Sequence, residues 1–328
     1  MNNPVLVDYV RSGFVESTHT GSVVLLASDG SQHSLGNPPP QIYPRSSLKP
    51  LFATGLVSAG LELTARQLAL ATASHSGTDE HAQVAREILG SAGLTEDALR
   101  CPPDLPREVD DLVALIRAGG SADRAHHNCS GKHAAMLATC VLKSWPTEGY
   151  LDPTHPLQVH LRATVTDLAG EEPGAPGVDG CGAPVWQLSL PALARAIARI
   201  ATASDTTPEG RVAAAARSHP ELVGGRRQCV TELMQYVPGL LSKEGAEGVW
   251  VAALNDGRAM AAKIDDGAMR ALPAILAATL RAWGYSGQPI DRWAADPVVG
   301  GGQPVGAILP SAALQDFLAT ATTLETTY

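Results

Sequence analysis

A turn in the C-terminal third of the chain constrains the fold most strongly. Asn255-Asp256-Gly257 separates two apolar runs, residues 248–254 and 258–264. An Asp-Gly pair favours the positive backbone angles of a tight turn, whose twist matches that of two antiparallel strands. The pattern therefore predicts a β-hairpin over residues 248–264.

A second hairpin is predicted near the N-terminus. Residues 22–27 form an apolar run, Asp29-Gly30 is a turn signal, and the chain returns through residues 32–35. Between the two hairpins, apolar residues recur at the three-and-four spacing of helices. This order predicts an α+β fold: an antiparallel sheet built from the N- and C-terminal segments, with helices packed on it and a helical insert.

One helix is expected to start near Ser46, because Pro50 is tolerated only in the first turn of a helix. The other predicted helices cover residues 61–73, 79–92, 106–118, 130–142, 155–168, 191–203, 210–216 and 269–283. After Tyr285 we expect only a short tail.

Composition and charge exclude several classes of protein. Of the 328 residues, 45% are apolar and 17% are charged, which is typical of a folded chain. The net charge is −9 and no Lys/Arg run interrupts it, so we expect no nucleic-acid partner. We also expect no membrane span, because no segment reaches roughly 18 apolar residues. The five scattered cysteines and the lack of an export signal favour a reduced, cytoplasmic compartment.

The first candidate for chemistry is Ser46-x-x-Lys49. On a helix, residues three apart share a face, so the lysine amine can reach the serine hydroxyl. A serine nucleophile needs a base, and a lysine serves when burial or nearby positive charge lowers its pKa so that the amine is neutral. The alternative is a solvated lysine on an exposed helical face, since so short a motif also occurs by chance.

A later motif strengthens the first one. Serine acyl-transferases of the penicillin-binding and β-lactamase type combine a helical Ser-x-x-Lys with a Lys-x-Gly at a strand edge. Here Lys243-Glu244-Gly245 immediately precedes the predicted strand at residues 248–254. The alternative is that Lys243 merely ends a turn which Gly245 enables.

A further serine lies in the loop Ala73-Ser74-His75-Ser76-Gly77 between two predicted helices. A lysine from elsewhere in the chain would make Ser74 a second catalytic serine. The alternative is a hydroxyl that caps a helix or bonds to loop backbone, as serines commonly do.

Two cysteines in glycine-rich turns form the last candidate. Cys129 stands before Ser130-Gly131-Lys132-His133, and Cys181 lies between Gly180 and Gly182. Thiolates suit a soft tetrahedral ion such as zinc, and by spacing Lys132 and His133 are both possible further ligands. The alternative is two buried thiols.

Together these segments resemble the rhizobial-type, or class 3, L-asparaginases, a family related in fold to serine β-lactamases and glutaminases. The similarity runs from about residue 12 to beyond residue 267, and the block around Cys129 is its most specific part. It is carried by residues 45–50, 73–76, 128–133, 179–181, 224–246 and 263–267.

The resemblance implies a role for each matching residue. Ser46 would be activated by Lys49, and Ser74 by Lys243. Cys129, Lys132 and Cys181 would hold a zinc ion, for which we favour an orienting or structural role. Arg45, His75 and Asp179 would contact or orient the substrate.

The implied unit is one catalytic domain over residues 1–328. Its sheet portion would comprise about residues 1–60 and 220–328, and its helical and metal-site portion about residues 61–219. The implied activity is hydrolysis of the side-chain amide of L-asparagine, and a homodimer is the default expectation. The alternatives are a glutaminase or another serine amidohydrolase of this fold, and a non-catalytic zinc-containing protein that binds an amide.

Overall fold

A single antiparallel sheet forms the centre of the computed structural model, which describes residues 3–323. Its order is β6-β7-β8-β2-β1-β10-β9, with β3 paired to β2. Both ends of the chain supply strands, which confirms the predicted α+β fold; residues 1–2 and 324–328 of the expected unit lie outside the described part. The strands are β1 (Val5–Arg11), β2 (Phe14–Leu26), β3 (Gln32–Leu35), β6 (Leu241–Gly245), β7 (Val249–Ala253), β8 (Ala259–Ile264), β9 (Asp296–Gly300) and β10 (Gln303–Pro310).

Both predicted hairpins are present. β7 and β8 pair from Val249↔Lys263 to Ala253↔Ala259, and β2 pairs with β3 from Val23↔Leu35 onward. All five residues of β7 are buried, because helices cover both faces of the sheet at this point. A separate small hairpin joins β4 (Pro176–Val178) to β5 (Pro184–Trp186).

The predicted helices all form, with shifted ends. The helix expected from residue 61 begins at Ala65, because the Thr64 hydroxyl and the Gln67 side chain cap each other's backbone N–H groups. The helices are α1 (Lys49–Ser58), α2 (Ala65–Ala71), α3 (Asp79–Ser91), α4 (Val109–Arg117), α5 (Ser130–Leu142), α6 (Pro156–Ala169), α7 (Leu190–Thr202), α8 (Pro208–Ser218), α9 (Pro220–Val223), α10 (Cys229–Tyr236), α11 (Leu272–Ala282), α12 (Gln288–Trp293) and α13 (Ala312–Thr323), with 3₁₀ turns η1 (Arg45–Leu48), η2 (Glu96–Ala98) and η3 (Met269–Ala271).

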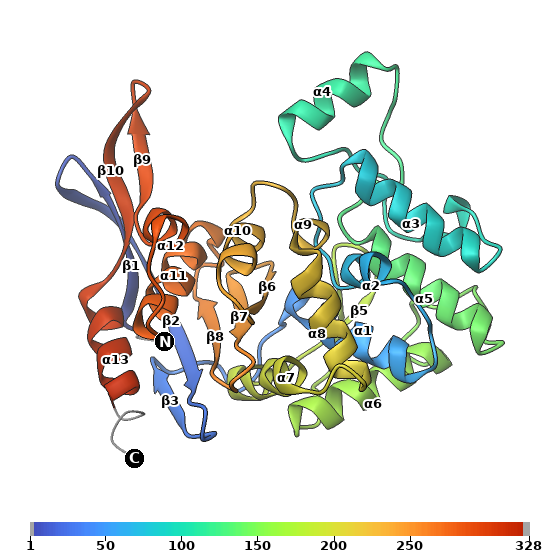
Figure 1. Cartoon of the computed structure of the whole chain (residues 1–328), viewed down its shortest axis with the longest axis horizontal. Coiled ribbons are helices and arrows are strands. Elements are labelled where there is room, and N and C mark those ends of the chain that lie inside the picture. The colour runs from blue at the N-terminus through green and yellow to red at the C-terminus, as the bar shows by residue number, and fades with distance from the viewer. Residues whose placement is uncertain (1–2, 324–328) are drawn as a thin grey trace.

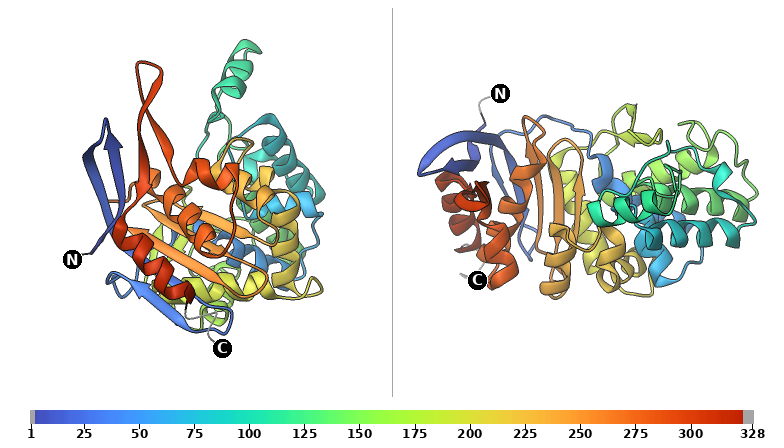
Figure 2. Two further views of the ribbon diagram at one scale, coloured as in Figure 1. Left: turned by 60° about the vertical axis from the view of Figure 1, so that its left-hand side comes forward. Right: turned by 90° about the horizontal axis from the view of Figure 1, so that it is seen from above.

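The sheet lies between two layers of helices (Figures 1 and 2). α7 packs on one face against β2, β7 and β8, whereas α11 and α13 pack on the other face against β1, β8 and β10. The remaining helices, α1 to α6 and α8, extend from the α7 side as a helical mass. α4 projects from this mass, and none of its residues is buried.

The expectation of a short tail after Tyr285 is wrong. This segment forms α12, β9, β10 and α13, and β10 pairs with β1 from Val7↔Pro310 to Arg11↔Gly306. The sequence of β10 does not look like a strand, because it contains two prolines and a glycine. Its partner strand lies some 300 residues earlier, beyond the range of a sequence window.

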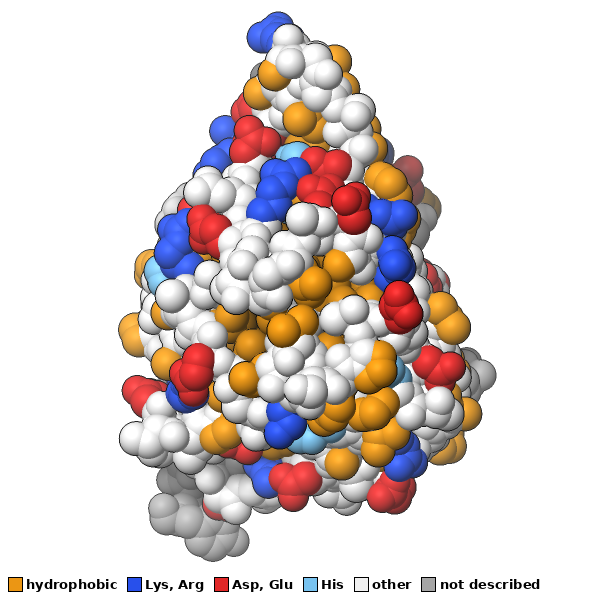
Figure 3. All heavy atoms as spheres, turned by 90° about the vertical axis from the view of Figure 1, so that its right-hand side faces the viewer, with side chains coloured by type: hydrophobic (Ala, Val, Ile, Leu, Met, Phe, Trp, Pro, Cys, Tyr) orange, Lys and Arg blue, Asp and Glu red, His pale blue; other side chains and the backbone are white. Residues whose placement is uncertain are grey.

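The structure contains no helix within residues 3–323 that is long and apolar enough to cross a membrane. The face that carries the helical mass shows Lys and Arg side chains interspersed with Asp and Glu (Figure 3), so this face presents no large patch of one sign.

Candidate active site

Ser46 lies in a tight turn that leads into α1. Its neighbour Arg45 has φ of 56°, in the left-handed region that non-glycine residues rarely occupy. The turn is held by Ser47, whose N–H and hydroxyl both donate to the carbonyl of Pro44, the latter at 2.7 Å. Ser46 itself is half-buried and lines a cavity.

Lys49, at the start of α1, is buried and points at the loop after α2. Its Nζ donates to the Ser74 hydroxyl at 3.1 Å and also to the Ala73 carbonyl. The lysine one turn after Ser46 therefore bonds to the other serine, which differs from the predicted pairing. Both printed partners of Lys49 Nζ belong to the loop after α2, so its side chain reaches across to that loop.

Ser74 sits in a loop that two other segments hold in place. The Ser74 N–H donates to the carbonyl of Val223 at 3.0 Å, and the His75 N–H donates to that of Asn128 at 3.2 Å. The His75 ring stacks on His81 at 4.7 Å between centroids, and its Nε2 pairs with the Ser130 hydroxyl at 2.9 Å. Burial above all holds the pKa of His75 well below its usual range, so the ring is neutral.

Lys243 precedes the strand β7, as predicted, and it also lies within a strand that was not predicted, β6. It is fully buried, and its Nζ donates to the backbone carbonyl of Glu244 at 2.9 Å and to Glu244 Oε1 at 2.8 Å. Burial lowers its pKa to about 8, the charge of Glu244 opposes this shift, and the charge of Lys49 adds to it. The two lysines thus lie near each other, although Lys243 bonds to Glu244 rather than to the expected Ser74.

The close surroundings of Gly245 explain why the Lys-x-Gly motif carries a glycine. A Cβ atom at this position would lie 2.2 Å from the Pro44 carbonyl oxygen and 3.2 Å from the Ser47 nitrogen. Only glycine lets β6 approach the Ser46 turn so closely. The motif therefore brings Lys243 beside Ser46 from a strand almost 200 residues away.

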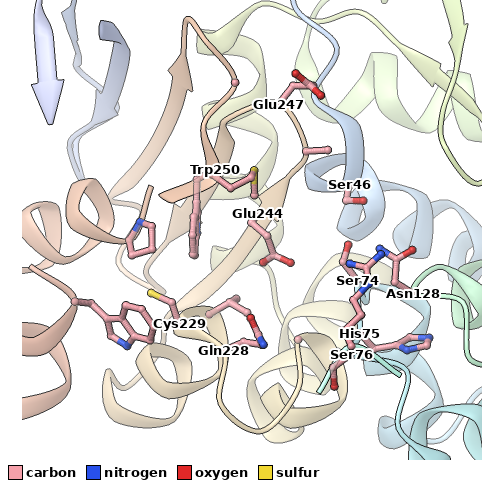
Figure 4. Close-up of a pocket in the computed structure, with 18 residues that line it drawn as sticks. Ser46, Ser74, His75, Ser76, Asn128, Gln228, Cys229, Glu244, Glu247 and Trp250 are labelled. Atoms are coloured by element: carbon pink, nitrogen blue, oxygen red, sulfur yellow. The ribbon is translucent and has the colours of Figure 1, made fainter. Parts of the chain in front are cut away.

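The two serines open onto one cavity of about 520 Å³ (Figure 4). Glu244 and Gln228 lie between these serines and Trp250 in this view. Its lining residues are Ser46, Ser74, His75, Ser76, Arg107, Asn128, Gly224, Gln228, Cys229, Val230, Glu244, Ala246, Glu247, Trp250, Gly267, Met269, Pro273 and Trp293.

Several of these lining residues were not predicted. Asn128 adjoins the predicted ligand Cys129, and Glu244 stands inside the Lys-x-Gly motif, so both had a local signal. Trp250 and Trp293 had none, because they come to the cavity only when β7 pairs with β6 and α12 packs on α10.

Arg45 and Asp179 pair with each other. Arg45 Nε donates to Asp179 Oδ1 at 2.7 Å, and the side chain of Asp179 is 11% exposed. Of the three predicted substrate-binding residues, only His75 is among the described residues that line the cavity. The Arg45–Asp179 pair instead joins the Ser46 turn to the turn that carries Cys181.

Cys129, Lys132 and Cys181 are brought together from α5 and the β4–β5 turn. All three are buried, and Lys132 Nζ lies 3.1 Å from Cys181 Sγ. The pKa of Cys181 is lowered, first by its hydrogen bond with the Cys129 thiol and then, against burial, by Lys132. The pKa of Cys129 is raised by the same hydrogen bond and by burial.

This donor set fits zinc. Two sulfurs and one nitrogen suit a tetrahedral ion, in which S and N ligands stand about 3.6 Å apart, close to the Lys132–Cys181 distance. Residues 3–323 hold no group of three or more His, Cys, Asp or Glu side chains placed to bind a metal. Cys129 and Cys181 would therefore need a donor of another type to complete such a site, and the Lys132 amine lies 3.1 Å from Cys181 Sγ.

Comparison with known proteins identifies the family. A model of the L-asparaginase II family matches residues 7–310. The chain belongs to the L-asparaginase II family. This family consists of amidohydrolases, so the predicted kinship and the expectation of an enzyme are confirmed.

Among solved structures, two of Mglu are similar to this member of the asparaginase II family. Mglu in its tris and glutamate form is 14% identical over 81% of this chain, with a TM-score of 0.40, and the chain spans 59% of its length. A second Mglu structure is 14% identical over 81% of this chain and 67% of its own, with a TM-score of 0.41. No curated protein matches the chain.

Proposed function

We propose that this chain hydrolyses the side-chain amide of L-asparagine to L-aspartate and ammonia. The family membership supports the substrate, and one observation carries the mechanism: Ser46 and Ser74 open onto one cavity, and buried Lys49 contacts Ser74 at 3.1 Å. Serine hydroxyls beside buried amines are the arrangement that acyl transfer requires.

Ser46 is the proposed nucleophile. Its hydroxyl forms no hydrogen bond within residues 3–323, so it is free to meet a substrate, whereas the Ser74 hydroxyl is already bound to Lys49. Ser46 Oγ bonds to the amide carbon, and its proton passes towards the Lys49 amine through the Ser74 hydroxyl. The backbone N–H of Ser46, at the start of the η1 turn, can stabilise the oxyanion.

The C–N bond then breaks as the departing nitrogen takes up a proton, and ammonia leaves. Lys243, whose pKa of about 8 leaves part of it neutral near neutral pH, accepts the proton given up by Ser46 and passes it to this nitrogen. Water finally attacks the aspartyl ester, and its proton restores the Ser46 hydroxyl. The sum is one amide and one water giving one acid and one ammonia.

We also propose that Cys129, Lys132 and Cys181 hold zinc. Bound there, the ion would supply positive charge and fixed geometry behind the serines. Arg45 and Asp179, which join the Ser46 turn to the Cys181 turn at 2.7 Å, transmit that geometry to Ser46. We propose a cytoplasmic location, because five free cysteines suit a reducing compartment. We propose a homodimer as the default assembly.

Ammonia release from asparagine and from glutamine tests the proposed activity. We expect Ser46→Ala to reduce the turnover of asparagine by at least about 10³-fold. Ser58→Ala, at the exposed far end of α1, is the matched control and should keep normal turnover. A glutaminase predicts faster release from glutamine, and a non-catalytic amide-binding protein predicts none from either.

Trapping of the acyl-enzyme tests the choice of serine. Acid quenching during turnover, followed by peptide mass analysis, should find an aspartyl group on Ser46. Ser74→Ala should slow formation of that adduct without moving it. An adduct on Ser74 in the native chain would mean that Ser74 is the nucleophile and that Ser46 assists it.

A further inference from the structure

The cavity is larger than its proposed substrate needs. L-Asparagine has nine non-hydrogen atoms, and even at a water molecule's share of about 30 Å³ each they fill at most about 270 Å³. The cavity measures about 520 Å³. Roughly half of it therefore lies beyond the reach of asparagine bound at the serines.

The far half has an apolar wall. We use this name for Val230, Trp250, Met269, Pro273 and Trp293. Trp250 stands across the cavity from Ser46 and Ser74 (Figure 4). An apolar wall of this kind in a pocket is where a ligand's hydrophobic group gains the most free energy on binding.

The two tryptophans are fixed so that their rings, and not their N–H groups, are available to the cavity. Trp250 Nε1 donates to the Ser242 hydroxyl at 2.7 Å. Trp293 Nε1 donates to Glu232 Oε2 at 2.8 Å, and the Arg292 guanidinium lies 4.5 Å from its ring centroid. Rings held in this way offer contact area at little cost in side-chain entropy.

The neighbours of Lys243 indicate which end of a bound substrate faces the apolar wall. Lys243 Nζ donates to Glu244 Oε1 at 2.8 Å, and Glu244, which lines the cavity, stands directly opposite Trp250 in the β6–β7 pairing. A departing amine that takes its proton at Lys243 therefore lies on the Trp250 side. The charged amino-acid head has no partner on the apolar wall and belongs at the polar end with the serines and Asn128.

We propose that the enzyme also hydrolyses amides of aspartate whose leaving amine carries an aromatic or aliphatic group, and that this group packs on the apolar wall. The inference rests on the proposed asparaginase activity. Ser46 Oγ bonds to the side-chain carbonyl carbon, the C–N bond breaks, and the amine departs with the proton that Ser46 gave up. Water then cleaves the ester, so that one amide and one water give aspartate and the free amine.

Aspartate β-(4-nitroanilide) is the probe, because 4-nitroaniline is coloured when released. The native enzyme should hydrolyse it with a kcat/KM at least equal to that for asparagine. Trp293→Ala should lower the ratio of the anilide kcat/KM to the asparagine kcat/KM by about tenfold, mainly through KM. Trp145→Ala, which removes a half-buried tryptophan outside the cavity, is the matched control and should leave the ratio unchanged.

Trp293→Leu is a second variant in case Trp293→Ala fails to fold, since leucine keeps apolar volume on the wall. It should lower the ratio less than Trp293→Ala, and thermal unfolding reports whether each variant is folded. Ammonia release from asparagine without 4-nitroaniline release overturns the inference and leaves the asparaginase proposal standing.

Two other results also overturn the inference. If Nα-acetylasparagine is hydrolysed and the anilide is not, the apolar wall faces the other end of the substrate. If neither asparagine nor the anilide is hydrolysed, the proposed function itself fails and the inference fails with it.

Discussion

Three buried lysines define the chemistry at the scale of single residues. Lys49, Lys132 and Lys243 are each at most 2% exposed. An ammonium ion removed from water must be paired or lose its proton. Lys132 stands against a thiolate, whereas Lys243 has its pKa lowered to about 8, mostly by burial.

The pKa of Lys243 predicts how activity depends on pH. A lysine accepts a proton only when neutral, so kcat/KM for asparagine should rise with pH and reach half of its plateau near pH 8. The charge of Glu244 raises this pKa, so Glu244→Gln should move the rise to lower pH. A pH profile of ammonia release measures both effects.

Glu247→Gln provides the control for that shift, because Glu247 lines the cavity but is not among the groups that raise the pKa of Lys243. Its profile should keep the native midpoint. A native profile that stays flat from pH 6 to 9 would contradict a role for neutral Lys243.

The thiolate of Cys181 predicts the metal content. Purified native protein should contain about one zinc ion per chain, and Cys181→Ala should lose it, because the variant keeps only two of the three proposed protein ligands. Elemental analysis of the folded protein measures zinc independently of activity. Cys140→Ala removes another buried thiol, on α5, and should keep the zinc; loss of zinc from both variants would argue against the assigned ligands.

At the scale of elements, the approach of β6 to the η1 turn assembles the site. A methyl group at residue 245 would meet the Pro44 carbonyl at 2.2 Å, so Gly245→Ala must push the strand away. We expect a loss of about 1–3 kcal/mol in the free energy of unfolding. We also expect kcat to fall by about 10²-fold, because Lys243 moves relative to Ser46.

Gly90→Ala is the matched control in α3, where a new Cβ meets nothing within 4 Å. It should stabilise the protein by about 0.5–1 kcal/mol and leave kcat unchanged. Urea unfolding and ammonia release measure both variants. Gly245→Ala with native kcat would show that the contact between β6 and η1 does not position Lys243.

At the scale of the whole molecule, the C-terminal segment completes both the sheet and the cavity. A chain that ends at Tyr285 loses β10, the partner of β1, and also loses Trp293. It loses five buried side chains worth together about 10 kcal/mol, comparable to the stability of a whole domain: Ile290, Val298, Ile308, Leu314 and Leu318.

We therefore expect the chain that ends at Tyr285 to show no cooperative unfolding in urea and no asparagine hydrolysis. A chain that ends at Thr323 keeps every described element and should unfold as the full chain does. Cooperative unfolding of the shorter chain at the native midpoint would mean that α12 to α13 form a dispensable appendage.

The sequence by itself determined the features that depend on near neighbours. The Asn255-Asp256-Gly257 turn specified the β7–β8 hairpin, and helical spacing predicted α5 from Ser130 to Leu142 without error. Both are local, because a turn needs particular backbone angles and a helix needs apolar residues every three or four positions. The motifs at Ser46 and Ser74 likewise identified residues that line one cavity, and the Lys243 motif includes a third lining residue, Glu244.

Only the tertiary structure decided which of these residues meet. Lys49 lies one turn from Ser46 in the chain and yet bonds to Ser74, since the loop after α2 brings the Ala73 carbonyl and the Ser74 hydroxyl to its amine. β10 and the apolar wall escaped prediction for the same reason: β1 pairs with a strand some 300 residues away, and Trp293 reaches the cavity through packing alone. Contacts between distant segments depend on how whole elements bury their apolar faces, and no local pattern encodes that.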